Sequence, residues 1–171
     1  MLSLRWLLVV SAVFLNGCAL TDFPGFGPRS GTGPASIVID LTTQKAYLYR
    51  GRTLVLESAA STGREGYATP TGKFHVIEKD LDHRSTLYGE YVQNGRVIIP
   101  GVDVRKQPRP SGTTFEGAPM PYFLRIVGAV GMHAGQVPRY PASHGCIRLP
   151  NRKARYFYDA ARVGTPVTIR R

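Results

Sequence analysis

Cysteine is scarce in this sequence. Two of the 171 residues are cysteine: Cys18, which ends an N-terminal apolar run, and Cys146. If the run is removed, Cys146 has no evident disulfide partner, so its thiol needs another use. We expect no metal and no cofactor, because His133, His144 and Cys146 lack the Cys-x-x-Cys or His-x-x-x-His spacing of common zinc sites.

Acidic residues are also few. The chain has 11 Asp and Glu against 22 Lys and Arg, a formal charge of +11. Charge alone is compatible with nucleic-acid binding, but the cations are spread through the chain rather than gathered in one tract. Together with the export signal described next, this argues against a nucleic-acid partner. The basic surface either keeps the protein soluble or attracts an anionic polymer.

The clearest apolar run, residues 6–15, is too short to span a membrane. One cation, Arg5, precedes it and Asn16-Gly17-Cys18 follows, which is typical of an export signal. The alternatives are a secretory signal cut elsewhere or a disposable apolar tail. We therefore divide the chain into a signal peptide (1–17), a Gly- and Pro-rich flexible tether (18–35) and one globular domain (36–171).

Short alternating or β-branched runs predict strands in most of the domain. One helix is predicted at residues 152–163, with Asn151 as its cap and Gly164 ending it. Residues 105–121 contain many Pro and Gly and predict a surface loop. The fold class is mainly β, a β-sandwich or mixed sheet with one short C-terminal helix. The predicted strands cover residues 36–41, 45–49, 53–57, 73–78, 91–92, 96–99, 122–127 and 166–169.

The segment Ser143-His144-Gly145-Cys146-Ile147-Arg148 is the candidate active site. A thiol attacks a carbonyl only as thiolate, and a nearby imidazole or cation favours that form. We predict Cys146 as nucleophile and His133 as base. His144 competes for the base role, but neighbours on an extended chain face opposite sides, so we expect it to be buried and supporting.

Other groups in and around this segment have candidate roles. Backbone N–H groups of Gly145 and Cys146 are candidates to stabilise an oxyanion. Arg148 either binds a substrate carboxylate or braces the loop. Tyr122 and Ser143 are candidates to line the pocket, and His75 and His83 are expected on a surface or sheet face.

Two blocks of sequence resemble a known family. Residues 119–123, 131–133 and 143–149 look like the catalytic signature of YkuD-type L,D-transpeptidases, and residues 61–63 with 69–74 resemble that family's other diagnostic stretch. The resemblance implies the same mainly β fold, with Cys146 as nucleophile and His133 as base. In many relatives Gly or Ser follows the histidine and the next carbonyl orients its ring, whereas here Ala134 follows. Lys153 replaces an acidic residue common in relatives at the helix start.

The resemblance also implies a substrate and a role in peptidoglycan biosynthesis, cell wall biogenesis and cell shape. The enzyme would take a peptidoglycan stem tetrapeptide, cleave after the L-centre of its third residue and release the terminal D-alanine. The acyl group would pass to a stem amine, giving a 3-3 cross-link, or to a protein that becomes attached to the wall. With water as acceptor the enzyme would be an L,D-carboxypeptidase. An inactive, lipid-anchored peptidoglycan-binding module is the non-enzymatic alternative.

The end of the signal resembles a bacterial lipoprotein box. Leu15-x-Gly17-Cys18 would make Cys18 the lipidated first residue of the processed chain. Several acyl chains would then anchor the protein stably in a membrane. Ala19, rather than Asp, follows the cysteine, which by analogy favours the outer membrane. The expected location is therefore periplasmic, held at the membrane by lipid.

Overall fold

The computed structural model describes residues 29–171. The predicted signal peptide, the lipidation site Cys18 and most of the predicted tether lie outside the described residues. Within residues 29–171, no helix has the length and apolar character needed to cross a membrane.

The first sheet joins both ends of the described chain. Its strand order is β3-β2-β1-β12-β4, and every neighbouring pair is antiparallel except β1 with β12. In β1 every second residue is buried, as expected of a strand with one face on a core. The five strands are β1 (Ala35–Asp40), β2 (Lys45–Arg50), β3 (Thr53–Ala59), β4 (Gly72–His75) and β12 (Pro166–Arg170).

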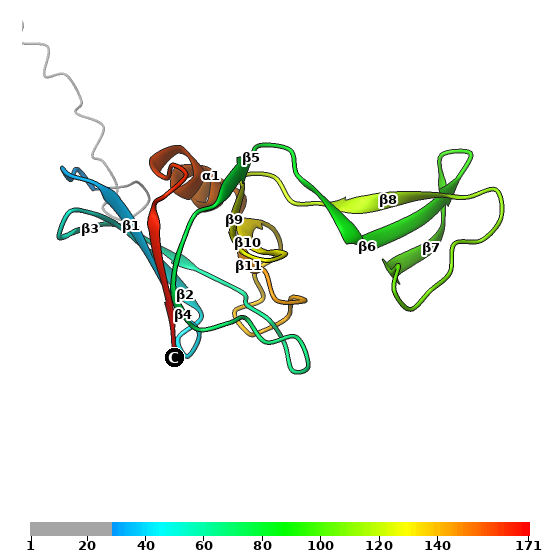
Figure 1. Cartoon of the computed structure of the whole chain (residues 1–171), viewed down its shortest axis with the longest axis horizontal. Coiled ribbons are helices and arrows are strands. Elements are labelled where there is room, and N and C mark those ends of the chain that lie inside the picture. The colour runs from blue at the N-terminus through cyan, green and yellow to red at the C-terminus, as the bar shows by residue number, and fades with distance from the viewer. Residues whose placement is uncertain (1–28) are drawn as a thin grey trace, which may run out of the picture.

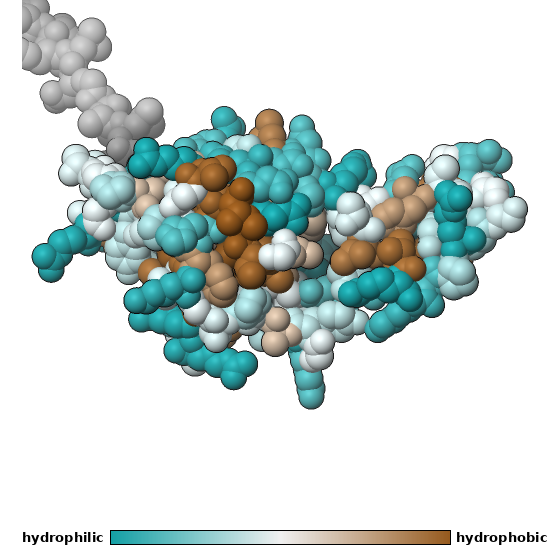
Figure 2. Space-filling view, viewed as in Figure 1, coloured by the Kyte–Doolittle hydropathy of each residue, from teal (hydrophilic) through white to brown (hydrophobic). Residues whose placement is uncertain are grey.

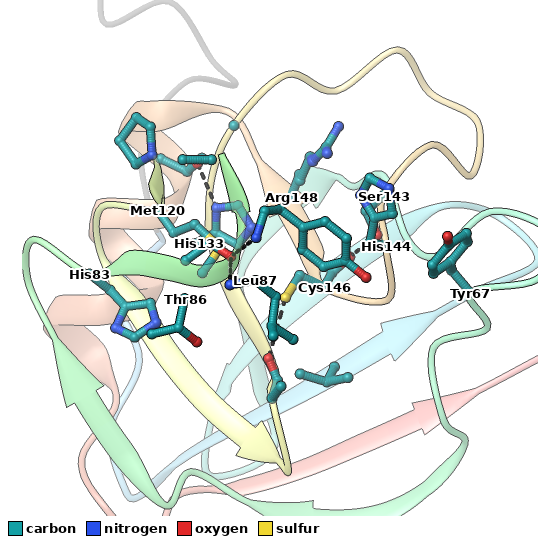
Figure 3. A pocket seen from close by; sticks show the side chains of 18 of the residues that line it. Tyr67, His83, Thr86, Leu87, Met120, His133, Ser143, His144, Cys146 and Arg148 are labelled. Carbon is teal, nitrogen blue, oxygen red and sulfur yellow. Dashed lines mark hydrogen bonds between the residues drawn. The ribbon is translucent and has the colours of Figure 1, made fainter. Parts of the chain in front are cut away.

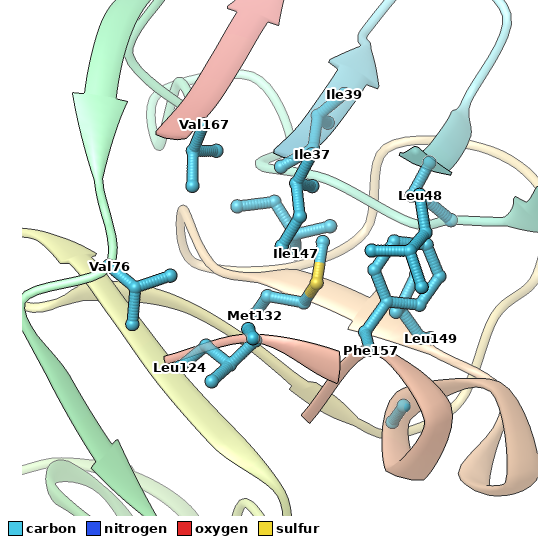
Figure 4. Packing of buried hydrophobic residues seen from close by; sticks show 14 of the residues in the cluster. Ile37, Ile39, Leu48, Val76, Leu124, Met132, Ile147, Leu149, Phe157 and Val167 are labelled. Carbon is cyan, nitrogen blue, oxygen red and sulfur yellow. The ribbon is translucent and has the colours of Figure 1, made fainter. Parts of the chain in front are cut away.

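The second sheet carries the candidate site. Its order is β11-β10-β9-β5, with β10 and β11 parallel, and the helix α1 (Asn151–Ala160) follows β11 directly. The two sheets and α1 enclose one apolar core, in which Ile37, Met132, Ile147 and Phe157 are buried (Figure 4). The strands are β5 (Glu78–Asp80), β9 (Phe123–Val127), β10 (Val130–Ala134) and β11 (Ile147–Leu149). The predicted fold class, mainly β with one short helix, is confirmed.

A third sheet forms an arm that projects from the body (Figure 1). It consists of β6 (Arg84–Gln93), β7 (Arg96–Asp103) and β8 (Thr114–Pro119), with β6 in the centre. The molecular outline narrows where the arm leaves the body, and apolar side chains appear on both parts of the face shown in Figure 2. We call this sheet the arm below.

The predicted loop at residues 105–121 is partly wrong, because it contains β8. Gly117 lies within β8 and contributes to its loop-like sequence, and Gly89 lies opposite it on β6. A Cβ on Gly117 would lie 1.9 Å from the Ser85 carbonyl oxygen, and one on Gly89 would lie 2.1 Å from the Glu116 carbonyl oxygen. The two glycines therefore allow the backbones of β6 and β8 to approach closely. The local sequence does not reveal this pairing.

The predicted strand at residues 73–78 is two strands, because the chain changes sheets there. Val76 N–H donates to Thr165 O, whereas the next residue, Ile77, donates to Arg125 O on β9. The chain thus leaves the first sheet at His75 and enters the second at Glu78. An alternating sequence does not show which partner strand each residue meets.

The helix is shorter than predicted and its caps differ. It begins at Asn151 with Pro150 as N-cap and no side-chain cap, and it ends at Ala160, before Gly164. Lys79 of β5 donates from Nζ to the carbonyls of Tyr158 and Ala161, at 2.7 Å each. Because this cap comes from a distant strand, the sequence around the helix does not contain it.

Candidate active site

The parallel pairing of β10 and β11 assembles the site. Met132 lies opposite Ile147 and His133 lies opposite Arg148. Met132 and Ile147 are buried in the core, so the alternating neighbours face the other way. Cys146, immediately before β11, lies on the same side as His133 and Arg148 (Figure 3).

That side opens into a cavity of about 670 Å³. The cavity lies between the second sheet, the 143–148 segment and the base of the arm. A volume of this size is typical of small-ligand sites. Of the predicted site residues, the cavity is lined by Cys146, His133, Ser143, His144 and Arg148.

Cys146 is a free, half-buried thiol. Its Sγ lies 3.7 Å from Ala129 O. Burial raises the pKa of the thiol, while the Gly131 N–H and the Arg148 and Arg125 guanidiniums act in the opposite direction. Because burial has the largest effect, the resting group is a thiol and needs a base before it can attack.

His133 is arranged as a neutral base. Its Nδ1–H donates to the Ala134 carbonyl at 2.8 Å, which leaves Nε2 as the proton acceptor. Burial, with a smaller contribution from Arg148, lowers the pKa of the imidazole to about 4. The ring is therefore uncharged near neutral pH. The substitution of Ala134 for Gly or Ser is harmless to this contact because only the carbonyl takes part.

Ser143 braces the turn that carries the thiol. Its hydroxyl donates to the Cys146 carbonyl at 2.6 Å and accepts from Gly145 N–H at 3.0 Å. Gly145 has φ +114°, a conformation that favours glycine. The Gly145 N–H, predicted as an oxyanion donor, is bonded to the Ser143 hydroxyl in this structure, and its role toward an oxyanion stays a prediction.

His144 lines the cavity and is only half-buried, so the expectation of a buried residue is wrong. The expectation fails because residues 144 and 146 are two positions apart and would share one side of an extended chain, and both line the cavity. Arg64 donates from Nη2 to His144 Nε2 at 2.7 Å, which agrees with the supporting role. Tyr88 of the arm stacks on the imidazole at 4.0 Å between centroids, and Tyr67 meets it edge-on at 4.7 Å.

The other sequence block, residues 61–69, holds the 143–148 segment in place. Ser61 and Arg148 exchange backbone hydrogen bonds, and Ser143 N–H donates to Thr62 O. Thr69 Oγ1 accepts from Gly63 N–H at 2.9 Å and donates to Gly145 O at 2.8 Å. We call these contacts the latch. They give a physical reason for the two blocks to occur together in one chain.

Arg148 is predicted either to bind a substrate carboxylate or to brace the loop. Arg148 is half-buried in the cavity wall, and within residues 29–171 no carboxylate forms a salt bridge with it. A guanidinium without an acidic partner favours binding of an anionic substrate group over bracing.

Tyr122 is absent from the cavity lining and packs edge-on against Tyr158, with 5.9 Å between ring centroids. The prediction that Tyr122 lines the pocket is therefore wrong.

Sequence reasoning missed several lining residues. Tyr67, Tyr88 and Arg125 reach the cavity from separate elements, and no local motif marks them. His83, expected on a surface or sheet face, lines the cavity and bonds to Asp80 at 2.9 Å. The spacing of Asp80 and His83 was the available signal.

Glu78, Asp80 and His83 place their ligand atoms within 4.8 Å of one another. However, Arg125 Nε lies 2.6 Å from Glu78 Oε2, so a guanidinium already occupies that carboxylate. A cation site would have to displace it, and the geometry does not favour a metal.

A mixed β fold with a thiol, a neutral imidazole and a guanidinium in one cavity has the parts of a cysteine–histidine acyl-transfer site. The sequence matches the family model of the YkuD L,D-transpeptidase catalytic domain over residues 34–169. The chain belongs to this family, and the resemblance of its two sequence blocks is confirmed.

Individual relatives agree. The chain is 32% identical over 117 residues to "Probable L,D-transpeptidase 3" of Mycobacterium tuberculosis. The aligned region covers 64% of this chain and 37% of that protein. The structure is similar to an L,D-transpeptidase from Mycobacterium smegmatis, with TM-score 0.57, 20% identity and coverage of 79% of this chain and 58% of that one. An L,D-transpeptidase from Stackebrandtia nassauensis gives TM-score 0.59, 18% identity and coverage of 88% and 60%. The chain thus spans less than two thirds of each of these proteins.

Proposed function

We propose that this protein is a peptidoglycan L,D-transpeptidase that acts through a thioester on Cys146. One observation carries the proposal: β10, β11 and the residue before β11 present a neutral imidazole, a guanidinium and a thiol on one side of a sheet, facing one cavity, and no carboxylate within residues 29–171 pairs with the guanidinium. Family membership supplies the expected donor, a peptidoglycan stem tetrapeptide.

In the acylation step, His133 Nε2 takes the proton of Cys146 Sγ as the sulfur attacks the carbonyl carbon of the third residue. The Cys146 N–H is the candidate donor to the developing oxyanion. His133 then gives the proton to the leaving nitrogen, the C–N bond breaks and D-alanine departs. Arg148 binds a carboxylate of the donor and orients it.

The thioester is then transferred. An amine of a second stem gives a 3-3 cross-link, and an amine of a protein gives attachment to the wall. Water as acceptor would make the enzyme an L,D-carboxypeptidase. A non-catalytic peptidoglycan-binding module would need no thiol in its cavity.

The test is intact-protein mass spectrometry of the domain with a stem tetrapeptide. The wild type should gain one acyl adduct and release D-alanine, whereas Cys146→Ala should do neither. An amine acceptor should then yield the cross-linked product. A folded wild type that forms no adduct and no product with donor and acceptor present would count against the enzyme and for the binding module.

We also propose that Cys18 is lipidated and that the lipid holds the domain in the periplasm at the outer membrane. The support is the Leu15-x-Gly17-Cys18 box and the residue Ala19 that follows it. Labelled fatty acid should be incorporated into the wild type and not into Cys18→Ser. Fractionation of the two membranes would test the location.

A further inference from the structure

Three histidines line the cavity, and the acylation step uses only His133. Nε2 of His144 is already bonded to Arg64, which leaves His83. His83 lies between β5 and β6 and lines the cavity together with His133 and Cys146. In Figure 3, His83 and Tyr67 lie at opposite sides of the view, with His133, Arg148 and Cys146 between them. His83 therefore borders the site at the end away from the Tyr67 loop.

The position of His83 is well defined. Its ring stacks on Phe123, at 4.1 Å between centroids and 13° between planes, and its side chain is 15% exposed. Its Nδ1 lies 2.9 Å from Asp80 Oδ2, and Asp80 Oδ1 in turn accepts from Asp82 N–H at 3.1 Å. Within residues 29–171, the second ring nitrogen, Nε2, has no hydrogen-bond partner.

His133 and His83 differ in what their Nδ1 contacts. For His133 the partner is a neutral carbonyl. For His83 the partner is the Asp80 carboxylate, which accepts from Nδ1–H and leaves Nε2 as the proton acceptor. The Arg125–Glu78 ion pair and the neutral His133 also lie near His83.

Acyl transfer needs a proton acceptor twice. The first proton leaves the Cys146 thiol, and the second leaves the nitrogen of the incoming amine. Each transfer converts a neutral imidazole into an imidazolium. His133 serves the first transfer in the proposed function, and His83, whose Nδ1 faces a carboxylate and whose Nε2 is free within residues 29–171, is available for the second.

Resting on the proposed function, we propose that His83 is a further catalytic residue: the general base for the acceptor amine, with Asp80 as its positioning partner. In this step the amine nitrogen bonds to the acyl carbon, the C–S bond breaks and its electron pair leaves with Sγ as thiolate. Nε2 of His83 takes the proton from the attacking nitrogen and later releases it to solvent. The thiolate regains a proton from solvent, so the enzyme returns to its starting state.

The experiment separates the two half-reactions by mass spectrometry, with stem tetrapeptide as donor and a stem amine as acceptor. We compare His83→Gln, Asp80→Asn and the control His75→Gln, whose residue is exposed on β4. In His83→Gln, the first-turnover release of D-alanine should stay within about twofold of the wild type, while amine-dependent deacylation falls about 100-fold. The acyl-enzyme should then accumulate. Asp80→Asn should show a smaller effect of the same kind, and His75→Gln none.

Hydroxylamine gives a readout that a structural role would not move. It is a stronger nucleophile than an alkyl amine and depends less on a base, so it should clear the acyl-enzyme of His83→Gln at nearly the wild-type rate. If His83→Gln does not fold, Asp80→Asn decides, because Asn keeps the size of the side chain and the acceptor for Asp82 N–H. Deacylation at the wild-type rate in a folded variant, or equal loss of both half-reactions, would overturn the inference. A wild type that never acylates would instead count against the proposed function.

Discussion

At the residue scale, burial sets the protonation states of the proposed nucleophile and its proposed base. Burial raises the pKa of Cys146 and lowers the pKa of His133 to about 4. The resting groups are therefore a neutral thiol and a neutral imidazole rather than an ion pair. In the proposed mechanism, catalysis then depends on proton transfer during attack, which makes the orientation of His133 by the Ala134 carbonyl important.

His133 should make the fold sensitive to acid. An unfolded histidine takes a proton near its ordinary pKa of 6.5, whereas folded His133 does so only near pH 4. Between these values the unfolded state binds more protons, so the stability contribution is complete above pH 6.5 and is lost as the pH falls toward 4. We expect His133 to account for about 3 kcal/mol of the loss in free energy of unfolding between pH 7 and pH 4.

The measurement is urea unfolding of the wild type and His133→Gln at several pH values. Glutamine has no proton to take up in this range, so the variant should lose less stability on acidification than the wild type does. Identical pH dependence in the two proteins would show that the imidazole is not held neutral by the fold.

At the element scale, the active segment is positioned by other segments rather than by its own secondary structure. Residues 143–146 lie outside the strands and helix, and the latch from residues 61–69 supplies their hydrogen bonds. Thr69 is buried and joins Gly63 to Gly145 through one hydroxyl. Loss of this hydroxyl would leave the Gly63 N–H and the Gly145 carbonyl without their partner.

Thr69→Val should therefore weaken both stability and activity. Valine has nearly the same shape but no hydroxyl, and we expect a loss of about 2–4 kcal/mol in free energy of unfolding. The acylation rate should also fall because the turn carrying Cys146 loses its support. Thr69→Ser keeps the hydroxyl and is the matched control. Equal stability of the valine and serine variants would mean that the hydroxyl contributes nothing.

Lys79 shows a second contact between elements. Its ammonium bonds to two carbonyls at the end of α1 and lies 4.2 Å from the centroid of the Tyr158 ring. A cation there satisfies free carbonyls and the negative end of the helix dipole. We expect Lys79→Met to lower the free energy of unfolding by about 1–2 kcal/mol.

Thermal or urea unfolding measures the effect. The control is Lys45→Met, which removes an exposed ion pair with Glu57. Such pairs contribute about 0–1 kcal/mol, so the control should change little. A Lys79 variant as stable as the Lys45 variant would show that the helix end does not need the cap.

At the scale of the whole molecule, the arm completes the cavity. Its residues Ser85 to Tyr88 and Arg105 line one side, while the body supplies the thiol and His133. Tyr88 stacks on His144, and its hydroxyl accepts a hydrogen bond from Arg105 Nη2 at 2.6 Å. Arg105 is held in turn by Asp103, whose pKa it lowers to about 2. The arm thus meets the body at the cavity through the Tyr88–His144 stack, and charged contacts within the arm hold Tyr88 in place, outside the apolar core.

Tyr88→Ala should affect the substrate more than the fold. Loss of the aromatic pair, about 1 kcal/mol, should loosen the arm side of the cavity, and we expect the KM for the donor to rise about 5-fold. The melting temperature should change little because Tyr88 is not part of the core. Tyr88→Phe keeps the stack and should retain most of the affinity. An unchanged KM in Tyr88→Ala would mean that the arm does not help to bind the donor.

The sequence by itself predicted the fold class, most strands of the first sheet, and Cys146 and His133 as candidate nucleophile and base. Alternation in the local sequence predicts alternating burial, as in residues 35–40. The two family blocks contain the residues proposed for the site chemistry. These features depend on near neighbours or on residue types that few other functions require.

Only the tertiary structure decided how distant segments meet. It placed His83 in the cavity and Tyr122 outside it, assigned the Gly145 N–H to Ser143 and revealed β8 within a Gly- and Pro-rich segment. It also showed that Lys79 caps a helix some 80 residues away in sequence. The physical reason is the same in each case: which groups approach one another depends on strand register and sheet packing, and these are set by the burial of the whole core rather than by local pattern.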